Sequence, residues 1–535
     1  MSETAPDSAD GNVASGTGDN SFVVVANRLP VDMIIESDGT KSWQESPGGL
    51  VSAVSPVLEK HQGCWVGWPG VTDEAPEPFR TERGVLLHPV ELTQHDFEEF
   101  YEGFSNATLW PLYHNLIVTP ELNRSWWDAY RDVNLRFATE VASVAAPGAT
   151  VWVQDYQLHL VPGMIREARP DLRIGFFLHI PFPAPELFRQ LPWRREVLAG
   201  TLGADLIGFQ TQDSARNFLH TLRALDFDVH YDDPTDAEFV NGARLPEENS
   251  VIGWCTTNHA ATSAAAADAQ AEVDGKAQQA REHVTRIGVF PISLDSAAVE
   301  LQAQQPETLA KAQHLSQQLG SPKVLMAGVD RLDYTKGIVQ RLLALEELLD
   351  SGELKKHGLK AKDISMVQVA TPSRERLEDY QATRKDVERI VSRINGKHGS
   401  MGRPVVSYVH SHQSFKKLVA LYLAADIMLV TALKDGMNLV AKEYVACHSD
   451  GTGALVLSEF TGAATQLTSA FMCNPYDKTQ LSQIILAAAT SKPSDRRARM
   501  RKMWENVREF DVDHWADSFL AELRADVASP GGEER

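Results

Sequence analysis

The strongest constraint on the fold of this chain is a series of short apolar segments without polar alternation, most of which lead into a polar loop and then a helical pattern. The segments cover residues 22–26, 64–68, 151–154, 174–178, 206–210, 286–291, 323–329, 366–370, 405–410, 427–431, 455–459 and 471–475. A strand without alternation is buried on both faces, as in a parallel sheet that is covered by helices on both sides. The sequence therefore predicts an α/β fold built from βα units.

The length of the chain, 535 residues, is more than one hydrophobic core normally supports, so we expect two large domains. The strand pattern of the first half ends at residue 291, and a new series opens at residue 323. We predict two Rossmann-like, doubly wound domains, over residues 21–291 and 292–500. Helices over residues 501–535 are expected to cross back toward the N-terminal domain, with Trp504 and Trp515 packing at the junction.

Two segments depart from this pattern. Residues 1–20 are acidic and polar, which predicts a disordered tail rather than a signal peptide. Residues 232–283 are rich in Ala, Asp, Gln, Glu and Thr. That composition indicates a surface insertion, a hairpin with an exposed helix, to which we assign no chemistry.

The composition also bears on location. No apolar run approaches the roughly 20 residues of a membrane span, so we expect no membrane partner. The four cysteines, Cys64, Cys255, Cys447 and Cys473, form no CxxC pair. They are expected to pack in the core of a cytoplasmic protein.

The net charge of -21 limits which ligands this chain can bind. It argues against nucleic acid as a partner, and it repels anionic substrates unless the site supplies its own cations. Cations do follow the apolar segments, in both halves of the chain: Arg28, Arg331, Lys336 and Arg374. Because the carboxyl ends of parallel strands meet at the edge where α/β sheets bind ligands, we expect these cations at a ligand cleft, with Arg331 and Lys336 placed to hold a pyrophosphate.

The stretch DGMNLVAKEY, residues 435–444, carries a second signal. It follows a buried strand and opens a helix, so it offers unpaired backbone N–H groups and a positive dipole end to a phosphate. Gly436 lets a ligand approach the backbone, and Asn438 can cap the helix. Asp435 and Glu443 can accept hydrogen bonds from sugar hydroxyls. An ordinary loop followed by an acid on a solvated helix face would show the same pattern.

Other polar residues end strands in the first half. Asp155 and His179 each close an apolar segment at the sheet edge that Arg28 is expected to share. Gly48 and Gly49 precede a helix, where backbone amides can meet a ligand. We find no DxD pair placed to hold a metal, and no Ser-His-Asp, HExxH or Cys/His cluster, so neither a metal nor a cofactor is expected.

Nine motifs support a specific resemblance. NRLP, PGGL, GFSNATLWPLYH, VWVQDYQL, GFFLHIPFP, DRLDYTKG, ATPSR, DGMNLVAKEY and LSEFTGAATQL occur in this order. The chain resembles the trehalose-6-phosphate synthases over residues 22–523. These are retaining glycosyltransferases of GT-B architecture, with two Rossmann-like domains facing across a cleft. The tail and the insertion depart from the compact members, which leaves loop contacts and assembly open.

The resemblance implies a reaction. Members transfer glucose from UDP-, ADP- or GDP-glucose to C1 of glucose 6-phosphate without a metal, and the product is α,α-trehalose 6-phosphate. It also implies a homo-oligomer, a dimer or a tetramer. The donor base cannot be read from the sequence, because members differ in it.

The resemblance also implies roles for individual residues. The acceptor would be bound by Arg28, Tyr101, Trp110, Asp155 and Arg374. The donor would be bound by Gly48, Gly49, His179, Arg331, Lys336, Asp435, Gly436, Met437, Asn438, Leu439, Val440 and Glu443. The catalytic residues would be Arg331, Lys336, His179, Asp155 and Asp435. Asp435 is the nearest candidate for a carboxylate nucleophile, but we expect it to bind the sugar while the acceptor attacks from the front face.

Three other readings remain open. A pseudo-glycosyltransferase that couples cyclitols would resemble this family closely, but Trp110, His179 and Asp155 favour glucosyl transfer. A glycogen-synthase-like enzyme would extend a polymer, whereas Arg28 and Arg374 suit a small phosphorylated acceptor. A catalytically silent sensor of sugar phosphates would bind without turnover.

Overall fold

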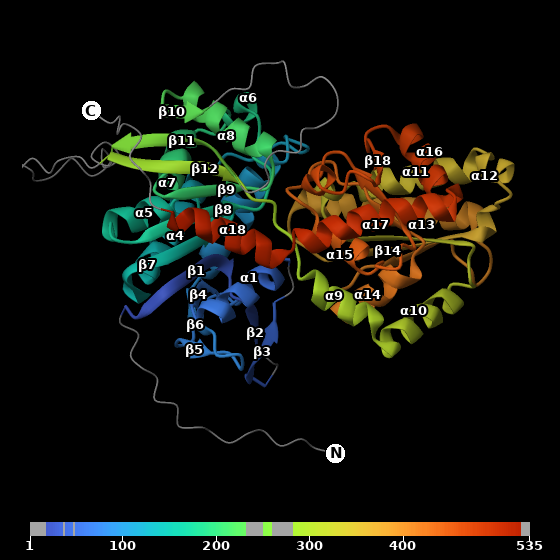
Figure 1. The fold of residues 1–535 in the computed structure, drawn as a ribbon, viewed down its shortest axis with the longest axis horizontal. Coiled ribbons are helices and arrows are strands. Elements are labelled where there is room, and N and C mark those ends of the chain that lie inside the picture. The colour runs from blue at the N-terminus through green and yellow to red at the C-terminus, as the bar shows by residue number, and fades with distance from the viewer. Residues whose placement is uncertain (1–17, 36–37, 47–48, 232–249, 259–281, 526–535) are drawn as a thin grey trace, which may run out of the picture.

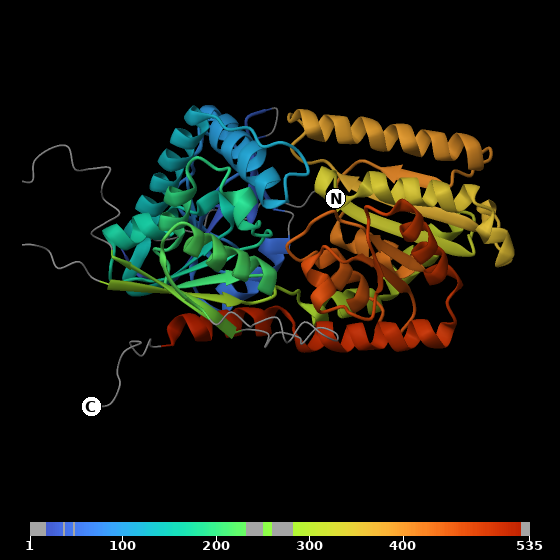
Figure 2. The same cartoon turned by 90° about the horizontal axis from the view of Figure 1, so that it is seen from above.

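Two large sheets, one in each half of the chain, form the framework of the molecule in a computed structural model that describes residues 18–35, 38–46, 49–231, 250–258 and 282–525 (Figure 1). The predicted α/β class is confirmed, and so are the two domains that lie side by side (Figures 1 and 2). The predicted tail, residues 1–17 of it, lies outside the described residues.

The N-terminal half contains a ten-stranded sheet with the order β10-β11-β12-β9-β8-β7-β1-β4-β6-β5. Its strands are β1 (Asn20–Arg28), β4 (Cys64–Trp68), β5 (Phe79–Arg80), β6 (Leu86–Pro89), β7 (Ala145–Gln154), β8 (Arg173–Leu178), β9 (Leu206–Phe209), β10 (Asp228–Tyr231), β11 (Ser250–Asn258) and β12 (Glu282–Val289). The strands from β12 to β6 run parallel, and the pairs at both edges are antiparallel. A separate hairpin joins β2 (Val31–Ile35) to β3 (Lys41–Glu45).

The helices of this half are α1 (Gly49–His61), α2 (Gln94–Asp96), η1 (Phe97–Leu109), α3 (Trp110–Tyr113), α4 (Arg124–Val144), α5 (Val161–Ala168), α6 (Pro185–Phe188), α7 (Arg194–Thr201) and α8 (Gln212–Ala224). Alternate residues of β1 enter two cores. Val23 and Val25 pack with η1 and α4, whereas Val24 and Ala26 pack with α1. Both faces of the sheet are therefore covered, which is why its strands show no polar alternation.

The C-terminal half contains a six-stranded, fully parallel sheet with the order β15-β14-β13-β16-β17-β18. Its strands are β13 (Val324–Arg331), β14 (Ile364–Thr371), β15 (Val406–Val409), β16 (Ile427–Val430), β17 (Ala454–Ser458) and β18 (Phe471–Cys473). Its helices are α9 (Ser296–Gln304), α10 (Pro306–Gln318), α11 (Ile338–Asp350), α12 (Glu353–Lys356), α13 (Glu378–His398), α14 (Phe415–Ala424), α15 (Leu439–Ala446) and α16 (Lys478–Thr490).

The last two helices connect the domains. Figure 2 shows α17 (Pro493–Glu509) along the C-terminal domain and α18 (Val512–Arg524) continuing along the N-terminal one. Trp515 of α18 is 1% exposed, and its ring centre lies 5.0 Å from that of Trp152 on β7. The chain thus crosses back as expected, although α17 begins before the predicted boundary at residue 501.

One prediction needs correction. Residues 250–258, within the segment 232–283 that we assigned to a surface insertion, form β11, which pairs with β10 on one side and β12 on the other. The side chain of Cys255 on this strand is fully buried. A hairpin was expected here, but the place of its strand in the large sheet depends on the sheet partners, which composition does not show. Residues 232–249 and 259–281 lie outside the described residues.

The four cysteines are buried and unbridged, as their scattered positions predict. None of the helices in the described ranges is long and apolar enough to span a membrane.

Replacing Trp515 with alanine should destabilise the protein by about 3–5 kcal/mol, because it removes a large, fully buried side chain that joins α18 to the N-terminal sheet. Thermal unfolding of this variant checks the expectation. Trp43→Ala, at a site that is 38% exposed, is the control and should change stability by less than about 1 kcal/mol. Equal losses in the two variants would contradict the role assigned to α18.

Candidate active site

Strand ends of the two domains meet in a shared region. Asp155 and His179 follow β7 and β8, while Arg374 follows β14. The Arg374 guanidinium donates a hydrogen bond of 3.0 Å to the hydroxyl of Tyr156 across the domain boundary. Gly436, after β16, lies so close to the carbonyl oxygen of His179 that any Cβ would overlap it. Only glycine allows this approach.

Arg374 forms the centre of a buried polar cluster. Its guanidinium lies 3.4 Å from the carboxylate of Asp333, donates to the hydroxyl of Tyr380, and lies 4.0 Å from the ring centre of Trp110. Only 5% of its side chain is exposed. Its backbone has a φ of 48°, which is uncommon for a residue with a side chain, so these contacts hold a strained conformation in place.

Asp333 is a residue whose role the sequence analysis missed. Burial acts to raise its pKa, but Arg374, Arg331 and Lys336 outweigh burial and lower the pKa to about 2. The carboxylate is fully buried and charged, and it accepts a hydrogen bond of 2.9 Å from the backbone N–H of Thr335. Its place in DRLDYTKG, directly before the turn that carries Lys336, was the available signal.

Arg28 lies beside a group of aromatic rings that includes Trp68 and Tyr101. The Arg28 guanidinium lies 4.7 Å from the ring centre of Trp68 and 2.6 Å from the carboxylate of Asp32. The ring of Trp68 lies 6.1 Å from that of Tyr101. Tyr101 belongs to η1, a π-helix, a rare form that often marks functional sites.

Asp155 is held at the boundary by its own backbone geometry. Its φ is 73°, and its side chain accepts a hydrogen bond of 3.1 Å from the backbone N–H of His179. Burial raises the pKa of this carboxyl to about 6, although Arg331 and Arg374 act in the opposite direction. Asp155 is therefore ionised at neutral pH and takes up a proton in mild acid.

Two glutamines fix the tautomer of His179. The amide oxygen of Gln210 accepts from the backbone of Ile292, so its amide nitrogen faces His179 Nδ1 at 3.5 Å. Nε2 donates to the side-chain oxygen of Gln154 at 2.8 Å. Burial lowers the pKa of His179 to about 3, so the ring is neutral and both of its nitrogens are engaged. This geometry suits a structural role of the side chain better than proton transfer.

Lys336 and Asp435 form a second buried ion pair. Their charged atoms lie 2.7 Å apart, and the side-chain amide of Asn438 donates to the same carboxylate oxygen at 3.1 Å. Burial acts against ionisation of Asp435, but Lys336 and Asn438 outweigh burial and lower its pKa. Asn438 also caps α15 as predicted, because its side-chain oxygen accepts from the N–H of Ala441. The first turn of α15 is thus joined to the loop after β13.

Unlike the buried Lys336 and the buried guanidinium of Arg374, Arg331 is exposed. Its guanidinium lies 5.2 Å from the ring centre of Trp110, and it makes no salt bridge to any residue in the described part of the chain. The same ring also contacts Arg374, so two cations of the C-terminal domain converge on one tryptophan of the N-terminal domain.

The other residues expected at the donor lie on both sides of the boundary. Met437 is buried, and the side chain of Leu439 packs against Gly49 at the start of α1. Glu443, one turn further along α15 than Val440, accepts a hydrogen bond of 2.7 Å from the hydroxyl of Tyr422. Burial raises its pKa. Gly48 lies outside the described residues.

His114 is a second residue that the sequence analysis did not single out. Its Nδ1 donates to the carbonyl of Trp110 at 2.8 Å, one helical turn earlier, so Nε2 is a bare acceptor; it is buried and has no partner within the described chain. Burial lowers its pKa to about 4, and the charges of Lys336 and Asp435 act on it. The sequence signal for this contact was the spacing of four residues between Trp110 and His114, which places both residues on one face of a helix.

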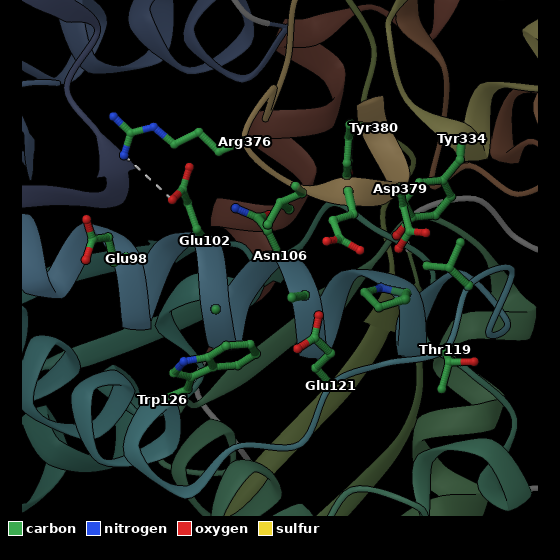
Figure 3. A pocket seen from close by; sticks show the side chains of 16 residues that line it. Glu98, Glu102, Asn106, Thr119, Glu121, Trp126, Tyr334, Arg376, Asp379 and Tyr380 are labelled. Carbon is green, nitrogen blue, oxygen red and sulfur yellow. Dashed lines mark ion pairs between the residues drawn. The ribbon is translucent and has the colours of Figure 1, made fainter. Parts of the chain in front are cut away.

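A cavity of about 370 Å³ lies beside this region, between η1 and the segment 376–380 (Figure 3). Its acidic lining residues are Glu98, Glu102, Glu121, Glu378 and Asp379, and Arg376 lies 3.9 Å from Glu102. Five carboxylates against one guanidinium do not suit a phosphorylated ligand. The cations at the strand ends are therefore the better candidate site for anions. Over the described ranges, no three His, Cys, Asp or Glu side chains are grouped so that they could hold a metal.

Comparisons with known proteins find relatives that match nearly the whole chain. A trehalose-6-phosphate synthase of Mycolicibacterium smegmatis is 49% identical over 511 residues, which cover 96% of this chain and 93% of that protein. One of Mycolicibacterium paratuberculosis is 48% identical over 97% of this chain and 98% of its own length.

Solved structures extend the comparison to the fold. The α,α-trehalose-phosphate synthase (UDP-forming) of Burkholderia xenovorans in complex with glucose-6-phosphate has a TM-score of 0.79 and 30% identity, and the match covers 94% of this chain and 100% of that one. A structure described as "Trehalose-6-phosphate from E. coli bound with UDP-2-fluoro glucose" has a TM-score of 0.78 and 31% identity, over 95% of this chain and 99% of that one. The predicted GT-B architecture is thereby confirmed.

The family model for glycosyltransferase family 20 matches residues 20–525. This range includes both domains, both buried ion pairs and the helix that crosses back. The resemblance drawn from the nine motifs is therefore confirmed, and this chain belongs to glycosyltransferase family 20.

Proposed function

We propose that this protein transfers glucose, with retention, from a nucleoside diphosphate glucose to C1 of glucose 6-phosphate and so forms α,α-trehalose 6-phosphate. The observation that carries the proposal is the position of Trp110. Its ring centre lies 4.0 Å from the guanidinium of Arg374 and 5.2 Å from that of Arg331. Two cations at one ring can bring a phosphate ester and a diphosphate close together. Similar structures hold glucose-6-phosphate and UDP-2-fluoro glucose, which supports UDP-glucose as a donor.

We assign the acceptor to the N-terminal domain and to Arg374. Arg28 and Arg374 would bind its phosphate together with Tyr101, whose ring lies 6.1 Å from that of Trp68, the ring beside the Arg28 guanidinium. Asp155 would accept hydrogen bonds from acceptor hydroxyls, since its carboxylate is ionised at neutral pH. Trp110 would shape the pocket at the acceptor anomeric carbon.

We assign the donor to the loops after β13 and β16. Arg331 and Lys336 would bind the diphosphate, and the N–H groups at the start of α15 would add their positive dipole end. Asp435 would then accept hydrogen bonds from glucose hydroxyls, and Glu443 from the ribose. Gly48, Gly49, Met437, Leu439 and Val440 would line the donor site.

Charge stabilisation is the main catalytic contribution in this proposal. Arg331 and Lys336 take up the charge that develops on the leaving nucleoside diphosphate. The acceptor hydroxyl attacks the donor glucose on the same face from which the leaving group departs. The departing phosphate oxygen accepts the proton of that hydroxyl. Asp435 is engaged by Lys336 and Asn438, which supports sugar binding over a nucleophilic role. His179 positions Asp155 through its backbone N–H. A cytoplasmic location and a dimeric or tetrameric assembly also form part of the proposal.

The direct test is product formation from glucose 6-phosphate with UDP-, ADP- and GDP-glucose, in the presence of a chelator. We expect release of UDP from UDP-glucose and an α,α-linked product, because the anion sites consist of side chains and backbone amides. Unphosphorylated glucose is the control acceptor and should react poorly. If glucose 6-phosphate raised the thermal stability but no donor gave product, the protein would be a sensor rather than a transferase.

Arg331→Ala should lower kcat by roughly 100- to 1,000-fold, because it removes a cation that acts on the charge of the transition state. Steady-state kinetics with the nucleoside diphosphate glucose checks this. Arg389→Ala, an exposed arginine paired with Asp386 on α13, is the matched control and should stay within about twofold of the unchanged protein. A change confined to KM would count against the role of Arg331.

The activity should fall as the pH drops through about 6, because protonation of Asp155 removes an acceptor of hydrogen bonds. The phosphate of glucose 6-phosphate titrates in the same range, with a pKa near 6. Asp155→Asn separates the two effects. The variant lacks the carboxyl of residue 155, so only the phosphate of the substrate still titrates in this range. The ratio of kcat/KM between unchanged protein and variant should fall about tenfold per pH unit below 6. A ratio independent of pH would refute the assignment.

A further inference from the structure

A fully buried guanidinium, that of Arg341 on α11, lies behind the loop that carries Arg331 and Lys336. Its Nη1 donates to Asp330 at 2.7 Å and to the side-chain oxygen of Gln368 at 3.0 Å. Nε donates to the hydroxyl of Thr431 at 3.0 Å, and Nη2 to the carbonyl oxygen of Lys336 at 3.4 Å. Each of its nitrogens therefore has a partner.

Three of these partners lie on or directly after three neighbouring strands. Asp330 is on β13, Gln368 is on β14, and Thr431 directly follows β16, in a sheet where β13 lies between the other two. Asp330 immediately precedes Arg331, and Thr431 opens the segment that leads to Asp435. One guanidinium thus connects both loops that we assign to the donor.

The two loops also touch directly at Gly337. The hydroxyl of Thr431 donates to the carbonyl oxygen of Gly337 at 3.0 Å, and the backbone N–H of Arg341 donates to the same oxygen at 3.0 Å. Gly337 has a φ of 62°, and a Cβ there would overlap the carbonyl oxygen of Thr431. The backbone next to Lys336 is therefore fixed against the strand end from which Asp435 follows.

Stability does not explain why a charged group lies here. Burying an ion pair costs desolvation, and apolar residues of similar volume often replace such pairs without loss of stability. Neighbouring interior positions of these strands, Ala327, Val369 and Val430, are apolar. What an apolar side chain could not supply is the set of directed hydrogen bonds to the loops.

We propose that Arg341, together with Thr431, is a positioning residue: it holds the loops of Lys336 and Asp435 in the geometry that binds the donor diphosphate, without touching the donor. The inference rests on the proposed function. It predicts that weakening this network impairs donor binding and turnover. Binding of the acceptor should change less, because Arg28 and Tyr101 lie on the other domain. Arg374 hydrogen-bonds to Asp333, Tyr380 and Tyr156 rather than to Arg341 or Thr431.

The first test is Thr431→Val, with Thr285→Val as matched control. Both threonines are fully buried, and both donate a hydroxyl hydrogen bond to a backbone carbonyl, that of Gly337 or Leu202. Both variants should lose similar thermal stability. Thr431→Val should lower kcat/KM for UDP-glucose at least about tenfold while KM for glucose 6-phosphate stays within about twofold. An effect no larger than that of Thr285→Val would overturn the proposal.

A second measurement does not depend on turnover. Calorimetry should show about tenfold weaker binding of UDP to Thr431→Val and to Arg341→Lys, which keeps the charge beside Asp330 but cannot make all four contacts. Arg341→Met, which removes the charge, should bind UDP more weakly than Arg341→Lys. Unchanged UDP binding in folded Arg341→Lys would refute the positioning role. Failure of the unchanged protein to bind UDP would instead refute the proposed function, so the two failures can be told apart.

Discussion

Two buried ion pairs, Arg374 with Asp333 and Lys336 with Asp435, hold together the edge of the C-terminal sheet on which the candidate site depends. A chain with a net charge of -21 creates a field that repels phosphates, so the site needs cations that are shielded from that field. A buried cation in turn needs a partner, because removing the partner of a buried pair costs about 3–5 kcal/mol. The carboxylates of Asp333 and Asp435 are these partners when no ligand is bound. When a sugar ligand is bound, its hydroxyls can hydrogen-bond to the same carboxylates.

The N-terminal domain contacts Arg331 and Arg374 through uncharged groups. Trp110 provides one ring for Arg331 and Arg374, and Tyr156 provides a hydroxyl for Arg374. The relative position of the domains is set by packing elsewhere. The rings of Trp515 on α18 and Trp152 on β7 lie 5.0 Å apart, so the C-terminal end of the chain forms part of the N-terminal core. The buried ammonium of Lys442 on α15 also donates to the carbonyl of Ile292, in the segment between the two domains, at 2.8 Å.

Much of the fold and part of the site could be predicted from the sequence. The strands, the helix caps and the cations at strand ends follow from local patterns of burial and charge. The place of β11 in the large sheet was not predicted, because a segment of mixed composition joins a sheet only through its partners. Asp333 and His114 were in quoted motifs but had no assigned role, since the burial of both residues and the pairing of Asp333 with Arg374, 41 positions away, arise only on folding. Arg341 sits in an ordinary helical pattern, and nothing in that pattern indicates its four partners.

The sequence by itself determined the α/β class, the order of the strands along the chain, and the residue types available at their ends. These properties depend on periodicities of two to four residues, which a linear pattern records. Only the tertiary structure decided which charges pair and which groups stay neutral. Lys336 and Asp435 are 99 positions apart, and Arg374 and Tyr156 are 218 positions apart. Ion pairing and pKa depend on distances of a few ångströms and on burial, and folding alone brings such distant residues that close.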